Sequence, residues 1–445
     1  MKTKYYKAKT LRLLSILLFS ISVNSEFVYA EIYKISPGDN SQEELQELLI
    51  LAKPGDTIFL REGTYSFTDA LSLNQSHVTI LGQGMDKTIL DFSNQKSGAQ
   101  GLLVSSDEVI LKDFAIINAV GDGIKVVNAN GIYFINIRTE WTNGPNTNNG
   151  AYGLYPVQSK NVFIQGCVAI GASDAGIYVG QSENIIVRNN IAKFNVAGIE
   201  IENSYYADVY NNKVSDNTGG ILVFDLPDLP QQQGQNIRVF NNISNHNNTD
   251  NFAPAGNIVS NVPRGTGVLI LGSKNVEIFE NEIGDNETIN LAIVSYFEET
   301  DDPHYYPHPR SITVNNNTFS NSGSNPDIKS NEIAKILNEL ADGDMPDIFW
   351  DGILPLSQII FGQPKNESII IRDNDNANFL KIDPIKFLLP FLDAAIRDHN
   401  NSDDERQPLG SVLIDVPWER IDSVSYTHLR AHETVLDLVC RLLLE

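Results

Sequence analysis

The chain has 445 residues and a formal net charge of −24, with 56 acidic and 32 basic side chains. A surface this acidic repels nucleic acids and anionic membranes, so the composition excludes a nucleic-acid partner. It also counts against an enzyme acting on a polyanion, unless cations bridge the two. Hydrophobic residues make up 42% of the chain, which is enough for a large core.

Residues 1–30 have the pattern of a secretory signal peptide. Basic residues precede an apolar run from Leu11 to Val23, and Val28-Tyr29-Ala30 fits a cleavage site with small residues. Serines interrupt the run, which is too short for a good membrane span. We therefore expect a periplasmic or secreted protein that does not span the membrane after cleavage.

Ser41 to Ala52 form the first predicted helix. Its apolar residues recur at helical spacing, and Ser41 with Glu44 resembles a capping box. We expect this helix to cover the open end of a stack of strands, because an exposed sheet edge would template aggregation.

A glycine followed by an aliphatic residue recurs along the chain at steps of 22, 30, 23, 22 and 22 residues. Short apolar triplets repeat in a second register, and asparagine pairs follow several of them. A fixed period of this size predicts a repeat architecture. The marking glycines are Gly101, Gly123, Gly153, Gly176, Gly198 and Gly220.

Each unit of ~22 residues holds about three short strands, and it can bury its apolar face only against neighbouring units. The fold class expected is all-β. Specifically, we predict a right-handed parallel β-helix, a pectin-lyase-like solenoid, over residues 31–325 with an N-terminal capping helix. The asparagine pairs, such as Asn189-Asn190 and Asn211-Asn212, suit corners between strands, because Asn tolerates left-handed backbone and pairs with itself when stacked.

The repeat pattern is interrupted after residue 325. Residues 326–364 are interpreted as an insertion with a helical stretch, and residues 365–423 as a final β-helix turn with a C-terminal extension. Residues 424–445 differ in composition from the rest, being basic and rich in leucine. We interpret them as a non-native tail that includes Cys440, with a genuine C-terminal helix as the alternative.

Aligning the turns on the glycine gives two columns of side chains that alternation places on one outer face. The column two residues after the glycine contains Lys125, Tyr155, Tyr178 and Glu200, and the column four residues after it contains Glu202. Glu200 and Glu202 are separated by roughly 7 Å of strand, similar to the spacing of the two carboxylates of a glycosidase.

Aromatic rings beside carboxylates are typical of a sugar-binding groove, because ring faces stack on sugars and acids bind hydroxyl groups. The predicted catalytic residues are Asp174, Glu200 and Glu202. The predicted substrate-binding residues are Tyr155, Tyr178, Lys125, Arg138 and Glu140. The alternative is that these outer columns are simply solvated. No metal site is predicted, and the cofactor is left open.

Four segments resemble a bacterial family of exported parallel β-helix repeat proteins: residues 149–158, 172–181, 196–203 and 218–227. Members of that family tend to be encoded beside an exported c-type-cytochrome-like protein. The resemblance therefore implies an exported c-type cytochrome as a possible partner.

Residues 152–158 look more distantly like the segment of periplasmic mannuronan epimerases that carries Asp-Pro-His-Asp. The corresponding residues here are Tyr155, Pro156, Val157 and Gln158. The histidine is replaced by valine and both acids are missing, which argues against epimerisation by that mechanism.

Two functions are therefore predicted. The first is the binding or processing of a polysaccharide on one outer face, by a lyase, an epimerase or a glycoside hydrolase if the protein is an enzyme. The second is a non-catalytic periplasmic accessory protein that docks a partner. An open polar groove at Tyr155 and Tyr178 would favour the first, and an apolar patch near Phe224, Leu269 and Leu271 the second.

Overall fold

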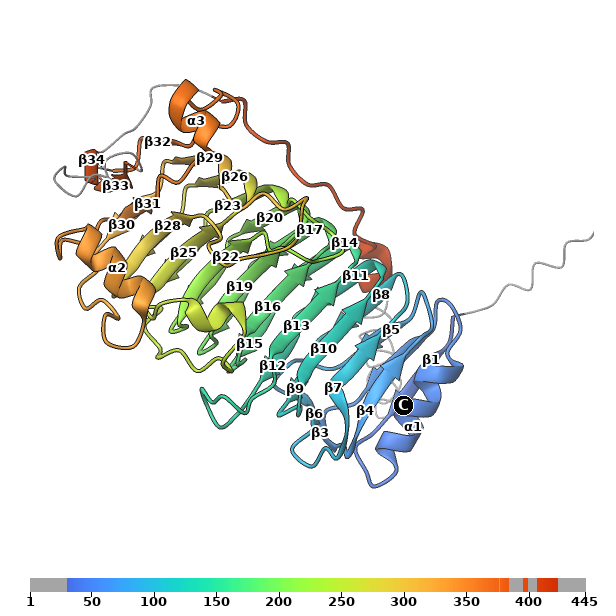
Figure 1. Cartoon of the computed structure of the whole chain (residues 1–445). Helices are drawn as coiled ribbons and strands as arrows, with labels where there is room; N and C mark the ends of the chain where they lie inside the picture. Colours follow the sequence, from blue (N-terminus) through green and yellow to red (C-terminus); the bar gives the residue numbers. More distant parts are fainter. Residues whose placement is uncertain (1–29, 376, 384–394, 399–405, 423–445) are drawn as a thin grey trace, which may run out of the picture.

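The computed structural model describes residues 30–375, 377–383, 395–398 and 406–422. The predicted signal peptide up to residue 29 and the predicted non-native tail with Cys440 lie outside these residues. Within them, the chain winds into a solenoid with three long sheets that run along its axis (Figure 1). The prediction of a parallel β-helix is confirmed.

Sheet A is one side of the solenoid. In spatial order it contains β1 (Ile32–Ile35), β2 (Thr57–Leu60), β5 (Thr79–Leu81), β8 (Val109–Lys112), β11 (Asn130–Ile135), β14 (Lys160–Gln165), β17 (Glu183–Arg188), β20 (Tyr205–Tyr210), β23 (Gln235–Phe240), β26 (Lys274–Phe279), β29 (Arg310–Asn315) and β32 (Ile370–Arg372).

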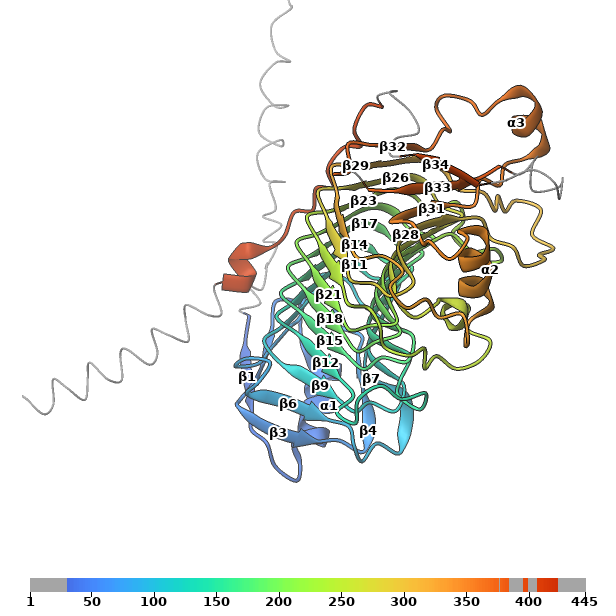
Figure 2. The same cartoon turned by 90° about the vertical axis from the view of Figure 1, so that its left-hand side faces the viewer.

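Sheet B is the second side, and its short strands stack on one another in Figure 2. It contains β3 (Gly63–Ser66), β6 (Thr88–Asp91), β9 (Ala115–Ile117), β12 (Arg138–Glu140), β15 (Val168–Ile170), β18 (Ile191–Lys193), β21 (Lys213–Ser215), β24 (Ile243–Asn245), β27 (Glu282–Gly284) and β30 (Thr318–Ser320).

Sheet C is the third side and faces the viewer in Figure 1. It contains β4 (Asp69–Leu73), β7 (Ser97–Val104), β10 (Asp122–Val127), β13 (Tyr152–Val157), β16 (Ala175–Gly180), β19 (Ala197–Glu202), β22 (Gly219–Phe224), β25 (Thr266–Leu271), β28 (Ile289–Val294), β31 (Ile348–Trp350), β33 (Phe379–Ile382) and β34 (Ala395–Asp398). Strand β34 pairs antiparallel with β33, whereas the other pairings of sheet C are parallel.

Helix α1 (Ser41–Leu51) covers the N-terminal end of the stack and buries Leu45 and Leu49. The helix is as predicted, but its cap is not. Asn40 takes the N-cap position without a side-chain cap hydrogen bond, and Ser41 is already helical. The Ser41 and Glu44 pattern therefore does not form a capping box.

The repeated glycines allow successive turns to approach closely. A Cβ atom at Gly123 would lie 2.7 Å from the carbonyl oxygen of Gly153, and one at Gly198 would lie 2.8 Å from that of Gly220. Such distances are too short for any side chain. The repeated glycines in the sequence thus mark the positions at which one turn packs directly on the next.

The two residues of each asparagine pair have different structural roles. The first residue of a pair, such as Asn189 or Asn211, has a positive φ at the corner. The second residue is buried and joins a ladder: Asn190 Nδ2 donates to Asn212 Oδ1 at 2.9 Å, and Asn212 Nδ2 donates to Asn242 Oδ1 at 2.9 Å. The amides of the ladder also donate to buried backbone carbonyl oxygens, those of Ile164 and Val187.

The segment interpreted as an insertion contains helix α2 (Glu332–Leu340), which lies over the C-terminal part of sheet C (Figure 1). Residues 348–350 then return to the stack as β31 between β28 and β33, earlier in the chain than the sequence pattern indicates. Helix α3 (Leu356–Phe361) follows, and β32 adds to sheet A.

Residues 406–422 form the C-terminal strap, which runs back along the outer face of sheet A (red in Figure 1) and ends in a helical turn at residues 418–422. The backbone N–H of Val412 donates to Asp208 Oδ2 at 3.1 Å, and Trp418 packs edge-to-face on Phe163 at 5.8 Å between ring centroids. The strap thus contacts strands from several turns. None of the helices in the described part of the chain has the length and apolar composition needed to cross a membrane.

Candidate functional site

The side chains of interest lie on the outer face of sheet C, on neighbouring rungs of β10, β13, β16 and β19. Lys125 pairs in register with Tyr155, Tyr178 with Glu200, and Gly180 with Glu202. Alternation along each strand turns these residues outward while Ile177 and Ile199 fill the core. The structure therefore brings Lys125, Tyr155, Tyr178, Glu200 and Glu202 onto one face.

Three tyrosine rings form an aromatic cluster at the centre of this face. The ring centroid of Tyr152 lies 4.4 Å from that of Tyr155 and 4.6 Å from that of Tyr178. The ring centroids of Tyr155 and Tyr178 are 5.0 Å apart. The Lys125 ammonium lies 4.6 Å from the centroid of the Tyr155 ring, which is within the range of a cation–π interaction.

Tyr152 was not predicted from the sequence, because it comes one residue before the marking glycine and so falls in neither outer column. A signal was present in its own column, where the next rungs carry Ala175 and Ala197. Two alanines beside a tyrosine leave room for the ring to lie across the neighbouring strands.

Three carboxyl groups lie beside these rings and are almost fully buried. The exposed fractions are 4% for Asp174, 1% for Glu200 and 7% for Glu202. Tyr178 donates its hydroxyl to Glu202 Oε1 at 2.6 Å. Asp174 accepts a hydrogen bond from the Tyr152 hydroxyl and one from Asn257 Nδ2, the latter at 3.0 Å.

Glu200 differs from the other two acids, because its Oε2 atom has no hydrogen-bond partner among the described residues. Burial, followed by repulsion from Asp174 and Glu202, raises the pKa of Glu200 well above its ordinary value. Burial and repulsion from Glu202 raise the pKa of Asp174 to about 7. Burial and the two acidic neighbours therefore favour the protonated form of Glu200.

The pKa of Glu202 is also raised by burial, but the hydrogen bond from Tyr178 opposes this shift. Burial raises the pKa of Tyr178 well above its ordinary value and that of Tyr155 to about 12. Both tyrosines therefore remain protonated at neutral pH, and Tyr178 acts as a hydrogen-bond donor. The cluster thus combines two acids that accept hydrogen bonds, Asp174 and Glu202, with one whose Oε2 atom does not.

A covering loop, residues 247–263, closes the face over these acids. It contains the short helix η1 (Ile258–Asn261), and its Asn251 Nδ2 donates to the carbonyl oxygens of Val259 and Val262, each at 2.9 Å. Val259 and Val262 are buried in an apolar cluster with Tyr178. The predicted acids thus lie in a packed, covered cluster rather than in an open groove.

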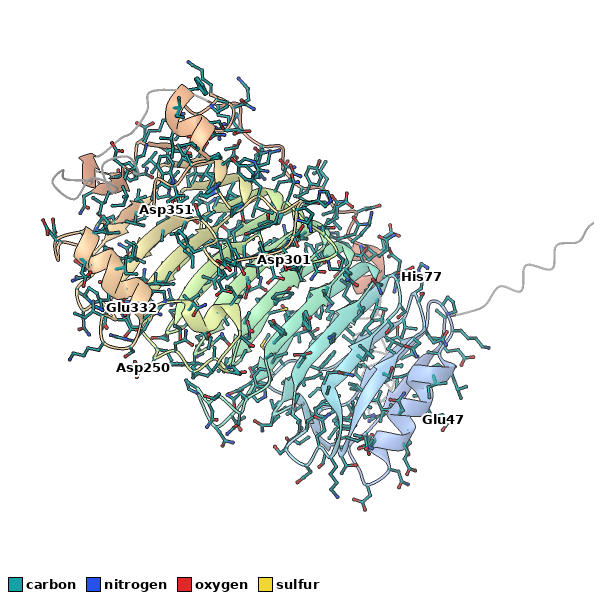
Figure 3. The ribbon with its side chains drawn as sticks, in the orientation of Figure 1. Glu47, His77, Asp250, Asp301, Glu332 and Asp351 are labelled. Atoms are coloured by element: carbon teal, nitrogen blue, oxygen red, sulfur yellow. The ribbon has the colours of Figure 1, made fainter. Side chains whose placement is uncertain are left out.

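A second loop, residues 295–309, also lies over sheet C. Figure 3 labels Asp250 in the covering loop and Asp301 in this second loop. Tyr305 of the second loop donates its hydroxyl to the carbonyl oxygen of Asp225 at 2.6 Å. Asp302 accepts from the backbone N–H groups of Asp228 and His304, at 3.0 and 2.9 Å, so its carboxylate fixes the loop.

Arg138 and Glu140 were predicted to line the same groove, and the structure contradicts this. Both lie on β12, which belongs to sheet B rather than sheet C. Arg138 forms an ion pair with Glu140 and donates to the carbonyl oxygen of Met85 at 3.0 Å. The prediction failed because these residues precede the corner between sheets B and C. Their outward side chains therefore point away from sheet C.

Trp141, the residue after β12, is buried and donates its Nε1 hydrogen to the carbonyl oxygen of Ala119 at 2.7 Å. In the described part of the chain, no group of three His, Cys, Asp or Glu side chains is placed to hold a metal ion.

Comparison with known proteins places this architecture among the right-handed β-helices. The sequence profile of the family described as right handed beta helix region matches residues 76–228. The pre-neck appendage protein of Bacillus phage B103 is 22% identical over 311 residues, which cover 58% of this chain and 35% of that protein. The chain thus spans about a third of the length of this curated relative.

Solved structures with a similar fold include enzymes that act on polysaccharides. The A-module of mannuronan C-5 epimerase AlgE6 from Azotobacter vinelandii is 15% identical, with 72% of this chain and 90% of that chain covered and a TM-score of 0.48. Pectate lyase Pel9A is 16% identical, with 72% and 74% covered and a TM-score of 0.38. The predicted right-handed β-helix class is confirmed.

Proposed function

We propose that the protein binds a carbohydrate on the outer face of sheet C and that Glu200 donates a proton to it. The observation that carries this proposal is the buried Glu200 Oε2 atom without a hydrogen-bond partner. A buried polar group left unpaired costs about 1–3 kcal/mol. An oxygen of a bound sugar would supply the missing partner.

The environment of the three acids supports a division of roles. Glu200 holds a proton, and a neutral carboxyl group can protonate a glycosidic oxygen. Glu202 accepts the Tyr178 hydroxyl and is the natural proton acceptor. Two positions along a strand separate the acids by about 7 Å, within the range of hydrolases that activate a water between their carboxyl groups.

Access to the cluster requires the covering loop to move. Asn257 reaches Asp174 from this loop through a single hydrogen bond of 3.0 Å. At the margin of the loop, Lys125, Tyr152 and Tyr155 remain half-exposed. A sugar would first meet these three side chains and then reach Glu200 as the loop is displaced. A hydroxyl-rich, uncharged glycan suits a chain with a net charge of −24.

The proposal is tested by applying the mature protein to an array of neutral glycans and then analysing any cleavage products. Glu200→Gln keeps the shape of the side chain but cannot donate the same proton, so we expect binding to persist and product to disappear. Glu282→Gln, an exposed acid on sheet B, is the matched control. If no glycan is bound, or if Glu200→Gln forms product like the wild type, the proposal is wrong.

A second candidate function is a non-catalytic accessory protein that docks an exported partner such as a c-type cytochrome. The apolar end of the same face favours it, because Phe297 and Ile333 expose apolar side chains there. Both candidates include export to the periplasm or outside the cell. Co-purification of the mature protein with an exported cytochrome, in the absence of glycan binding, would support this second function.

A further inference from the structure

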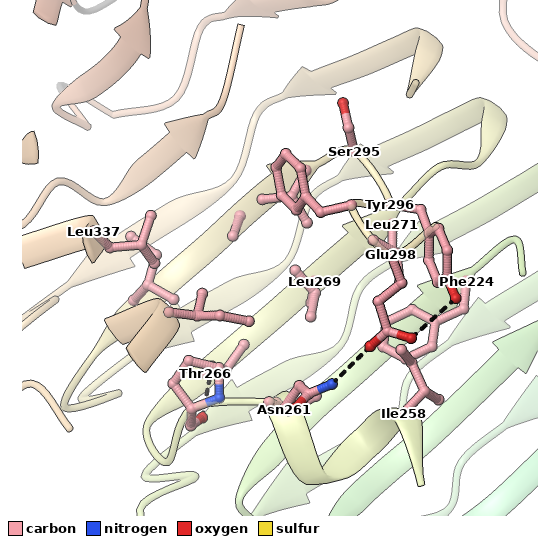
Figure 4. A pocket seen from close by; sticks show the side chains of 17 residues that line it. Phe224, Ile258, Asn261, Thr266, Leu269, Leu271, Ser295, Tyr296, Glu298 and Leu337 are labelled. Carbon is pink, nitrogen blue, oxygen red and sulfur yellow. Dashed lines mark hydrogen bonds between the residues drawn. The ribbon is translucent and has the colours of Figure 1, made fainter. Parts of the chain in front are cut away.

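A pocket lies at the apolar end of sheet C, beyond the acid cluster (Figure 4). Its floor is the outer face of β25 and β28, including Leu269 and Ala292. The covering loop contributes Ile258, the second loop contributes Tyr296, and α2 contributes Leu337. Four separate parts of the chain therefore converge on one cavity.

The cavity has a volume of about 140 Å³ and an almost entirely apolar lining. An engineered cavity of about 150 Å³ in another protein stays dry and binds benzene. The volume here thus matches one aromatic ring, and the lining offers a water molecule few hydrogen-bond partners.

Glu298 provides a polar group at the mouth of the pocket. Asn261 Nδ2 donates to its Oε1 atom at 3.4 Å and the Tyr296 hydroxyl donates to its Oε2 atom at 3.3 Å. Both contacts are long, and a carboxylate can accept about four hydrogen bonds. The carboxylate is exposed and can therefore accept another donor at the opening.

Apolar side chains continue outside the mouth. Phe297 is 66% exposed and Ile333 is 44% exposed, and both line the pocket. An isolated exposed apolar residue is ordinary, but two at the rim of an apolar cavity extend the surface on which a ligand can pack.

We infer that this pocket binds a small aromatic amine, with the ring inside the cavity and the ammonium group facing Glu298. The ring packs against Leu269 and Ala292, and the charge of the amine complements both the mouth and the acidic surface. The inference is separate from the proposed carbohydrate site, because it uses neither Glu200 nor the covered acids. Phe224 lies between the pocket and the acid cluster, since it lines the pocket and pairs in register with Glu202 on the neighbouring strand.

Calorimetric titration of the mature protein with benzylamine, toluene and benzoate tests the inference. Benzylamine should bind most tightly, toluene more weakly and benzoate most weakly, because benzoate places a negative charge at Glu298. Ala292→Leu fills the floor and should weaken benzylamine binding at least tenfold. Leu269→Phe is a second filling variant in case the first does not fold.

Glu298→Gln should weaken benzylamine several-fold and leave toluene unchanged, with Glu282→Gln as the matched control. The inference is overturned if none of the three probes binds, if folded filling variants bind benzylamine like the wild type, or if benzoate binds as tightly as benzylamine. Failure to bind a glycan, or unchanged product formation in Glu200→Gln, would not affect these titrations, so the two proposals fail independently.

Discussion

Tyr178 donates its hydroxyl to Glu202 at 2.6 Å across two neighbouring strands. The contact depends on Gly180, which pairs in register with Glu202 and lies on the same face as Tyr178. A Cβ atom at Gly180 would overlap the Tyr178 ring and its hydroxyl oxygen. The missing side chain therefore lets the tyrosine ring lie along its own strand and reach the acid on the next rung.

Tyr178→Phe removes the only described donor to Glu202 and leaves the carboxyl group buried. We expect the free energy of unfolding at pH 8 to fall by about 1–3 kcal/mol, the cost of a buried polar group without its partner. Urea denaturation measures the change. Tyr206→Phe is the control, because Tyr206 is 48% exposed. Equal losses in the two variants would contradict a specific role for the hydroxyl.

Gly180→Ala displaces the Tyr178 ring and should lower the free energy of unfolding by about 1–3 kcal/mol, the usual cost of overpacking. Gly38→Ala is the matched control, because a Cβ atom there meets no other atom within 4 Å. Urea denaturation of both variants checks the expectation. A Gly180→Ala protein as stable as Gly38→Ala would show that the ring has another place to lie.

The sequence was sufficient to predict the fold because the repeat marks a physical constraint. The close approach of Gly123 to Gly153 imposes glycine at a fixed interval, and that interval also sets which side chains share a column. The column of Lys125, Tyr155, Tyr178 and Glu200 follows from the same register. Arg138 was misassigned because no repeating sequence signal marks the corner at which the chain turns from one sheet to the next.

The covering loop was the main feature that the sequence did not predict. Residues 247–263 interrupt the period, and a pattern of outer columns predicts what lies on a face but not what is folded over it. Asn257 is 83 residues from Asp174 in the chain, and no local pattern indicates their hydrogen bond. Burial of Glu200, on which its raised pKa depends, comes from this long-range packing.

Asn212→Ala removes one rung of the internal ladder. Asn212 donates to Val187 O and to Asn242 Oδ1, each at 2.9 Å, and its own Oδ1 accepts from Asn190. Several buried groups lose their partners, so we expect the free energy of unfolding to fall by about 3 kcal/mol or more. Asn148→Ala, at an exposed position, is the control in thermal unfolding. A similar loss in both variants would contradict the importance of the ladder.

Trp418→Ala should loosen the C-terminal strap without unfolding the solenoid. The strap is held by the Trp418 ring on Phe163 and by a few hydrogen bonds, including that of the Val412 N–H to Asp208. We expect faster hydrogen exchange at Val412, while amides of the core strand β16 stay protected. Leu413→Ala is the control, because Leu413 is 86% exposed. Unchanged exchange at Val412 would show that Trp418 does not hold the strap.

Glu200→Gln should change how stability depends on pH. The folded-state pKa of Glu200 is raised by burial and by its acidic neighbours, so the folded protein binds this proton more tightly than the unfolded chain does. Its contribution to stability is therefore fully present below the unfolded pKa and is lost as pH rises through the folded pKa. Asp174, with a pKa raised to about 7, follows the same sign.

The wild type should accordingly lose stability between about pH 4 and pH 8, and Glu200→Gln, which carries no titrating proton, should lose less. Urea denaturation at pH 5 and pH 8 gives the difference directly, with Glu282→Gln as the control for an exposed acid. If Glu200→Gln and the wild type lose the same stability over this range, Glu200 does not hold its proton in the folded protein, and the proton-donor role proposed for it fails as well.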